Sequence, residues 1–171
     1  MFSINYYSYV DSSQTYIYFG GYESSYASSD DDIVWFDLTG SGFWEIDGGK
    51  VYYGKDSNDS LGTLGNAIID TGSSIAYIDY SIIDKIVEAS GKDCVINSGL
   101  YECSCTSADN FDDLYFGFGN ENDDPYTKVQ VNNDNYILYE SGTCFILLAD
   151  GSETLLGDAF LRDIYIIHDV D

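Results

Sequence analysis

The feature that most constrains the fold of this chain is its succession of short β-branched and aromatic runs, each ended by Gly, Asn, Asp or Ser. Strands joined by tight turns produce this pattern. Examples of the runs are TYIYFGG (15–21), DIVWFDL (32–38), DLYFGFG (113–119) and CFILLA (144–149). The 171 residues are enough for one well-buried domain and too few for two comfortable ones. The sequence therefore predicts a mainly β, single-domain fold.

Helical periodicity is clear in only one segment, YSIIDKIVEASG (80–91). Its apolar residues fall on one face, as in a helix that packs against a sheet. These residues are Ile82, Ile83, Ile86 and Val87. Ser81 followed by Asp84 resembles a capping box, and Gly91 can end the helix. A second, short helix is expected at DAFLRD (158–163).

The chain is strongly acidic, with 30 Asp and Glu against 6 Lys and Arg and a formal net charge of −24. Such a surface repels nucleic acid phosphates and anionic lipids, so neither nucleic acid nor membrane is an expected partner. Protonation in acid would relieve the self-repulsion, which favours an acidic compartment; solubility is the alternative explanation. Neither a transmembrane run nor a signal peptide is recognisable, and we expect the chain to be an internal piece of a longer protein.

The cysteine content favours disulfides over a metal site. The four cysteines are Cys94, Cys103, Cys105 and Cys144. Their spacing does not suit a metal, and His168 is the only histidine, so no metal is expected. Two disulfides indicate a secreted or endomembrane protein, although spacing alone allows three connectivities. A glycosylation sequon at Asn58 lies in a polar loop and agrees with that compartment.

The stretch NAIIDTGSSIAYID (66–79) carries the candidate chemistry. An apolar run ends at Asp70, which emerges into a small polar turn. Gly72 lets the backbone turn tightly, while Thr71 and Ser73 offer hydroxyl groups. A carboxylate presented in this way accepts hydrogen bonds from nearby N–H and O–H groups, and these bonds fix its orientation. Capping of a turn is the simpler interpretation of the tripeptide by itself.

The residues around this turn resemble the second active-site segment of the pepsin-like aspartic proteases, peptidase family A1. The resemblance continues in order along nearly the whole chain. The matching segments are FSINYY (2–7), the stretch from YIYFGG to WEID (16–47), NAIIDTGSSIAYID (66–79) and TLLGDAFLRDIYIIHD (154–169). The resemblance implies that residues 1–171 are the C-terminal lobe of the bilobal pepsin-like acid protease fold, with the N-terminal lobe and the final strand absent.

The resemblance also implies an aspartic endopeptidase that works at acid pH. Each lobe of these enzymes gives one Asp, and the pair activates a water that attacks the scissile carbonyl, without cofactor or metal. Two close carboxylates share a proton and titrate as a unit, which Asp70 alone cannot do. We therefore expect the isolated chain to be inactive. Its expected partners are the N-terminal lobe of the same protease, joined or clipped, and a polypeptide substrate.

Other positions take their roles from the resemblance one at a time. Thr71 matches a threonine in the hydroxyl network beneath the paired Asp residues, and Gly72 matches a glycine that lines the substrate. Ser73 takes a position that contacts the substrate backbone or the catalytic carboxylate. Ile68 and Phe43 would line pockets on the primed side, and Leu155 would touch the cleft. These are the candidate substrate-binding residues.

Packing in the protein core is an alternative explanation for Phe43 and Leu155. Leu156 and Gly157 resemble the floor beneath the catalytic turn. For the cysteines, the resemblance implies a Cys105–Cys144 disulfide, which leaves Cys94–Cys103 as a second, local bridge.

Two alternative functions also stay open. A pepsin-like lobe without catalysis would be a binding or structural module; the intact Asp-Thr-Gly turn speaks against it, but the second turn lies outside this chain. A retroviral-type protease would pair two identical chains; the length, the cysteines and the LLGDAF segment argue against it. The expected location is the lysosome or vacuole, or the outside of the cell.

Overall fold

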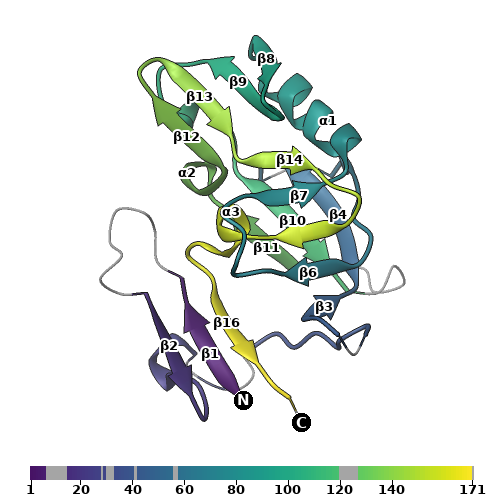
Figure 1. The fold of residues 1–171 in the computed structure, drawn as a ribbon, viewed down its shortest axis with the longest axis vertical. Helices are drawn as coiled ribbons and strands as arrows, with labels where there is room; N and C mark the ends of the chain where they lie inside the picture. The colour runs from purple at the N-terminus through teal and green to yellow at the C-terminus, as the bar shows by residue number, and fades with distance from the viewer. Residues whose placement is uncertain are drawn as a thin grey trace. The chain divides into compact units, whose positions relative to one another are not determined.

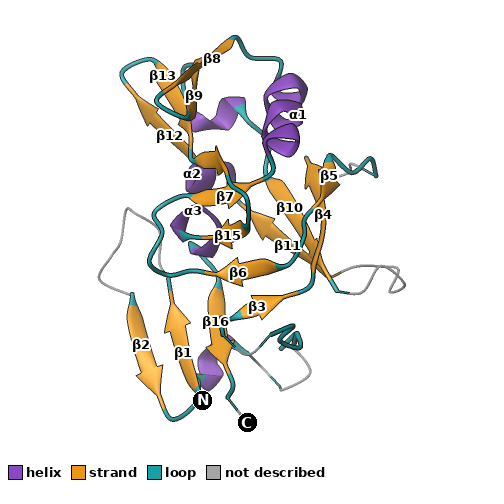
Figure 2. Ribbon diagram, turned by 45° about the vertical axis from the view of Figure 1, so that its right-hand side comes forward, coloured by secondary structure: helices purple, strands orange, loops and turns teal. Residues whose placement is uncertain are grey.

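The computed structural model describes residues 1–6, 15–27, 29, 33–40, 42–55, 58–119 and 127–170. The chain divides into two compact units, one of residues 1–35 with 161–171 and one of residues 36–160. Figure 1 traces the strands and helices along the chain, and Figure 2 shows how strongly strands outnumber helices in it. The mainly β prediction is confirmed.

The smaller unit is built on a three-stranded antiparallel sheet with the strand order β16-β1-β2. Its elements are β1 (Phe2–Asn5), β2 (Tyr16–Phe19), the 3-10 helix η2 (Ser24–Tyr26) and β16 (Tyr165–His168). Two buried polar side chains of the central strand reach tyrosine hydroxyls. Ser3 Oγ lies 2.8 Å from the Tyr165 hydroxyl, and Asn5 Nδ2 donates to the Tyr26 hydroxyl at 3.0 Å. These bonds satisfy groups that would otherwise be costly to bury.

The described residues of the larger unit form three sheets. The five-stranded sheet has the order β14-β7-β15-β6-β3, with β3 (Glu45–Ile46), β6 (Ala67–Ile69), β7 (Ala76–Ile78), β14 (Leu148–Asp150) and β15 (Thr154–Leu156). One four-stranded sheet has the order β11-β10-β4-β5, with β4 (Gly48–Tyr53), β5 (Gly62–Thr63), β10 (Leu114–Phe118) and β11 (Thr127–Val131). The other has the order β12-β13-β9-β8, with β8 (Cys94–Asn97), β9 (Leu100–Ser104), β12 (Ile137–Glu140) and β13 (Thr143–Ile146).

Few helices accompany these sheets in the described part of the chain. They are α1 (Tyr80–Ser90), the 3-10 helix η4 (Ala108–Asn110), α2 (Asn133–Tyr136) and α3 (Asp158–Leu161). Helix α1 contacts β14 and β4, and so lies against the two sheets that carry those strands. Large apolar side chains from the sheets and from α1 form the core of this unit. The fully buried ones include Val51, Ile78, Ile82, Ile83, Ile86, Leu114, Phe116, Ile146, Leu148 and Leu156.

Helix α1 confirms the predicted helical segment but begins with a different cap. Asp79 is the N-cap, and its side chain accepts a hydrogen bond from the Ser81 N–H at 2.8 Å. The predicted capping box of Ser81 and Asp84 is therefore wrong, because Ser81 already lies inside the first turn. Gly91 ends the helix as expected, with φ +63° and its N–H bonded to the Glu88 carbonyl.

Two other local predictions differ from the structure. The run 32–38 forms no strand over its described residues 33–37; only Leu38 makes an isolated bridge, to Ile46. Within the described residues no strand pairs with 33–37, and Val34 and Trp35 are about half exposed, at 53% and 51%. β propensity alone therefore does not make a strand here. Helix α2 was not predicted, since four residues are too few to show a helical period. The short helix predicted at 158–163 is confirmed as α3.

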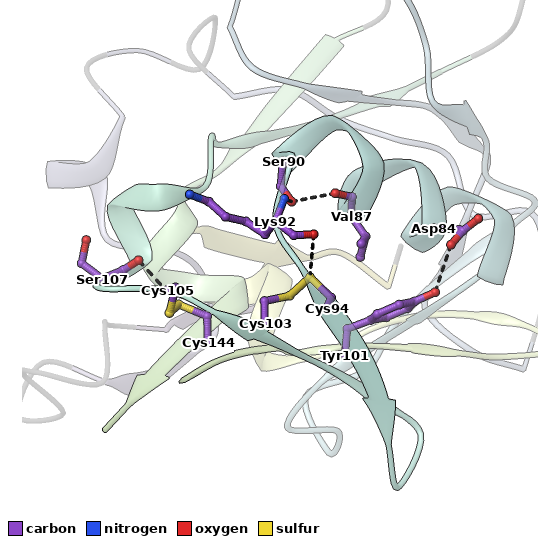
Figure 3. The surroundings of a disulfide bond; sticks show 10 residues. All are labelled: Asp84, Val87, Ser90, Lys92, Cys94, Tyr101, Cys103, Cys105, Ser107 and Cys144. Carbon is purple, nitrogen blue, oxygen red and sulfur yellow. Dashed lines mark hydrogen bonds between the residues drawn. A yellow bond between two sulfur atoms is a disulfide. The ribbon is translucent and has the colours of Figure 1, made fainter. Parts of the chain in front are cut away.

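Both disulfides belong to the β12-β13-β9-β8 sheet or its flank (Figure 3). Cys94 in β8 is bonded to its direct cross-strand partner Cys103 in β9. Cys105, just after β9, is bonded to Cys144 in β13. This is the pairing that the family resemblance implies. Cys103 and Cys144 also pair across β9 and β13, so the two bridges are neighbours.

The helices of the described residues are all too short or too polar to cross a membrane.

The core position Ile86 offers a direct test of the packing of α1. Truncation to Ala removes buried methyl and methylene groups and leaves a cavity beneath the helix. We expect Ile86→Ala to lower the free energy of unfolding by about 2–5 kcal/mol. Glu88→Ala on the exposed side of the same helix should change it by less than about 0.5 kcal/mol. Denaturant titration of the two variants measures this, and equal effects would contradict the assigned core.

His168 makes the stability of the smaller unit depend on pH. Its ring stacks on Phe2 at 4.5 Å between centroids, and burial lowers its pKa below the ordinary value. Between the lowered folded-state pKa and about pH 6.5, the unfolded chain therefore binds a proton that the folded chain does not. The contribution of the neutral imidazole to stability is complete above that pH and is lost as the pH falls through the lower, folded-state pKa.

We expect His168→Phe, which keeps the stacking on Phe2, to flatten the fall in stability on acidification below about pH 6.5. Denaturant unfolding of both proteins at about pH 7.5 and at about pH 5 measures the difference. Every other titrating group is common to the two proteins, so parallel pH curves would exclude His168 as the source.

Candidate active site

Asp70 lies directly after β6, where the sheet ladder gives way to a turn. The apolar run before it forms the strand end that was predicted, but only Ala67 is fully buried; Ile68 and Ile69 are half-buried. The Ile69 N–H donates to the Trp44 carbonyl at 2.9 Å. Asp70 extends the ladder by one bond, because its N–H donates to the Leu156 carbonyl of β15 at 3.1 Å. Its backbone is thus held by the sheet, and its side chain lies at the C-terminal end of β6.

The strand topology determines the path of this turn. β6 and β7 follow each other in the chain, yet they are not neighbours, because β15 is inserted between them. β15 runs parallel to β6, with Leu156 opposite Ile69, and Leu155 pairs with Tyr77 of β7. The connection 70–75 must therefore pass across the end of β15. The N–H of Asp158, just beyond β15, donates to the Ser73 carbonyl at 2.8 Å and ties the turn to that strand end.

Gly157 is packed against the backbone of this turn. A Cβ atom there would lie 2.3 Å from the carbonyl oxygens of both Ser73 and Ile75. No side chain fits at such a distance, since the clash is with backbone and not with a flexible group. The position identified from the sequence as the floor of the turn is therefore one where only glycine is tolerated.

The carboxylate of Asp70 is oriented by two hydrogen bonds. Gly72 donates its backbone N–H to Oδ1 at 3.0 Å, and Ser73 donates its hydroxyl to Oδ2 at 2.6 Å. Each carboxylate oxygen thus has one donor and keeps capacity for another partner. The Ser73 N–H also bonds the Asp70 carbonyl at 3.3 Å, which closes the turn. A half-buried carboxylate held in this way can accept a proton from, or hydrogen-bond to, a group placed before it.

A groove of about 490 Å³ opens beside β6. Ile68 and Phe43, two of the candidate substrate-binding residues, line it; Leu155, the third, lies next to Ile68 in the sheet but is not among the lining residues. The groove is lined by Phe43, Glu45, Thr63, Leu64, Gly65, Asn66, Ile68, Asp79, Gly151, Ser152, Glu153 and Thr154. Phe43 is 68% exposed, so it is not a core side chain.

Sequence reasoning missed the acidic side chains Glu45 and Glu153 on the groove wall. No motif marks them, because Glu45 meets Ile68 only through the pairing of β3 with β6. The alternation of apolar and polar residues in WEID (44–47) was the one available signal, since it places Glu45 on the open side of a strand whose next residue, Ile46, is buried.

The remaining candidate residues are spread over the structure. Thr71 is exposed in the turn, and Asn58 of the sequon is exposed on the segment before β5. His168 belongs to the other unit. Within the described ranges, no group of three or more His, Cys, Asp or Glu side chains is arranged to hold a metal ion.

Comparison with known proteins gives a consistent result. A family model described as "Eukaryotic aspartyl protease" matches residues 1–171. The chain is 28% identical over 169 residues to "Vacuolar protease A" of Arthroderma otae, covering 94% of this chain and 38% of that protein. It is 29% identical over 104 residues to "Secreted aspartic protease 8" of Candida albicans, covering 61% of this chain and 24% of that protein.

A solved structure shares the fold. The aspartic proteinase from Irpex lacteus superposes with a TM-score of 0.72 at 17% identity, over 96% of this chain and 52% of that one. This chain therefore spans about half of that structure and less than two fifths of the two relatives above.

Gly157 provides the test of the site's architecture. We expect Gly157→Ala to destabilise the protein by about 3 kcal/mol or more, because the new methyl group clashes with two carbonyl oxygens that the turn cannot move. Gly65→Ala is a matched control, since nothing lies within 4 Å of a Cβ at that position. Denaturant unfolding measures both changes, and a tolerated Ala at 157 would contradict the packing described for the turn.

Proposed function

Because the chain belongs to the eukaryotic aspartyl protease family, we propose that it is the C-terminal lobe of an acid-active aspartic endopeptidase and supplies Asp70 as one of two catalytic carboxylates. The observation that carries the proposal is the held carboxylate of Asp70. Gly72 and Ser73 each donate one hydrogen bond to it. Ile68, two residues before Asp70, lines the groove, whose lining residues do not include Asp70 itself.

The second carboxylate must come from outside this chain. Hydrolysis of an amide by this chemistry needs one carboxylate to take a proton from water and a partner to hydrogen-bond the scissile carbonyl. Two close carboxylates share one proton, so the pair acts as a unit. Asp158 does not take this role in the proposal. It is the first residue of helix α3, and its N–H donates to the Ser73 carbonyl and so holds the turn in place. We therefore assign the second Asp to the N-terminal lobe of the same protease.

The remaining positions follow from their places around Asp70. Thr71, Gly72 and Ser73 form the active-site turn, and Ser73 orients the catalytic carboxylate. Ile68 and Phe43 bind substrate side chains from the groove, and Leu155 supports Ile68 from the neighbouring strand.

The relatives are named vacuolar and secreted proteases, and the chain's two disulfides suit the same compartments. We place this protein in the vacuole or lysosome, or outside the cell. Asn58 is then a glycosylation site, because the sequon is exposed.

Asp70→Asn is the test of this function. The amide keeps the shape of the side chain but cannot take the proton of the attacking water. We expect the full-length protein that contains this chain to cleave a denatured protein at acid pH, and the variant to lose about 10³-fold or more in kcat/KM. Asp47→Asn, at an exposed site between β3 and β4, is the matched control and should keep full activity.

The outcomes separate the competing functions. Full activity of the Asp70→Asn variant would contradict the catalytic role. Absence of cleavage by the unaltered full-length protein would favour the inactive binding or structural module. Activity of the isolated 171-residue chain would favour the pairing of two identical chains.

A further inference from the structure

Glu45 lies on the same face of the five-stranded sheet as Asp70. Directly paired residues of neighbouring antiparallel strands point to one face, and Glu45 of β3 is paired with Ile68 of β6. Ile68 and Asp70 are two residues apart along an extended backbone, so they share that face as well. A carboxylate of β3 is therefore the diagonal neighbour of the proposed catalytic carboxylate.

The burial of the strands confirms which face is open. Ile46, Ala67 and Leu156, which alternate with these residues, are at most 8% exposed and form the core side. Glu45, Ile68 and Asp70 are all half-buried. The row Glu45–Ile68–Leu155 thus crosses three strands on the open side of the sheet.

The groove on this face combines an apolar wall with free carboxylates. Phe43, Leu64 and Ile68 supply the apolar part, while Glu45 and Glu153 supply charge. Among the described residues, none pairs with the side-chain carboxylate of Glu45 or of Glu153 in a hydrogen bond or an ion pair. Asp79 differs from them, because its side chain is engaged in capping helix α1.

Such a groove matches one kind of substrate side chain. Lysine and arginine have an apolar stem that packs along hydrophobic surface and a cationic head that binds carboxylate. We propose that Glu45 makes the protease prefer a substrate with a lysine or arginine close to the scissile bond, its stem on Ile68 and Phe43 and its head on the Glu45 carboxylate. The inference rests on the proposed function.

The geometry limits where that basic residue lies. Ile68 is two residues from Asp70, a separation of about 7 Å along a strand. An extended substrate advances by about the same rise per residue, so a side chain over Ile68 and Glu45 belongs to one of the three residues on one side of the cleaved bond. The register of the bound peptide selects one of these positions.

The experiment uses the full-length protease that contains this chain and peptides that each hold one cleavable bond. Lysine, norleucine or glutamate is placed in turn at each of three positions on either side of the bond. Norleucine keeps the stem of lysine and lacks its charge, so the ratio of kcat/KM between the two peptides reports the charge alone. The assays run at about pH 5.5, above the ordinary pKa range of carboxylic acids.

At one position, we expect lysine to exceed norleucine by about 10-fold. Glu45→Gln should bring that ratio close to one, and Glu45→Lys should invert it so that glutamate exceeds lysine. An inverted preference cannot result from a poorly folded variant. Glu140→Gln, on β12 and outside the groove, is the matched control and should leave both the ratio and the rate unchanged.

Three results would overturn the inference. Equal cleavage of lysine and norleucine peptides at all positions would exclude a charge preference while leaving the protease function intact. A preference that persists in Glu45→Gln but disappears in Glu153→Gln would assign the selectivity to Glu153. If no peptide is cleaved by the unaltered protein, the proposed function fails and the inference fails with it.

Discussion

The contact between Gly157 and the backbone of the turn after β6 is the constraint on which the rest of the site depends. The two strands that flank the turn are separated by β15, so the chain between them must cross the end of that strand. The crossing is close, with the Ser73 and Ile75 carbonyl oxygens 2.3 Å from where a Cβ would stand. Hydrogen bonds from Asp70 and Asp158 then fasten the turn to β15 on both sides.

This arrangement lets the sheet perform two tasks at once. Because side chains alternate along a strand, Ile46, Ala67 and Leu156 pack into the core, while Glu45, Ile68 and Leu155 face the open side. The core residues hold the strands in register, and the register in turn places Asp70, Ile68 and Glu45 in one neighbourhood. The proposed catalysis and the proposed selectivity therefore use the same half-buried face, and the stability of the unit comes from its opposite side.

The sequence alone predicted the parts that depend on local pattern. The mainly β class, the extent of α1, the short helix at 158–161 and the polar turn after the apolar run 67–69 could all be identified from residue type and spacing. The disulfide pairing required the family resemblance, since spacing leaves three connectivities open. The capping by Asp79 and the unpaired run at 33–37 were mispredicted, because each depends on competition between neighbours that local propensity does not resolve.

What the sequence by itself determined is the chemistry that is present: a carboxylate at Asp70 with Gly72 and Ser73 beside it to donate hydrogen bonds. Only the tertiary structure decided which residues surround that carboxylate. Glu45 and Ile68 are 23 positions apart in the numbering and share no motif, and Gly157 is more distant still. Their meeting depends on strand order and register, which arise from burying one face of each strand in a common core, and a linear pattern does not contain that information.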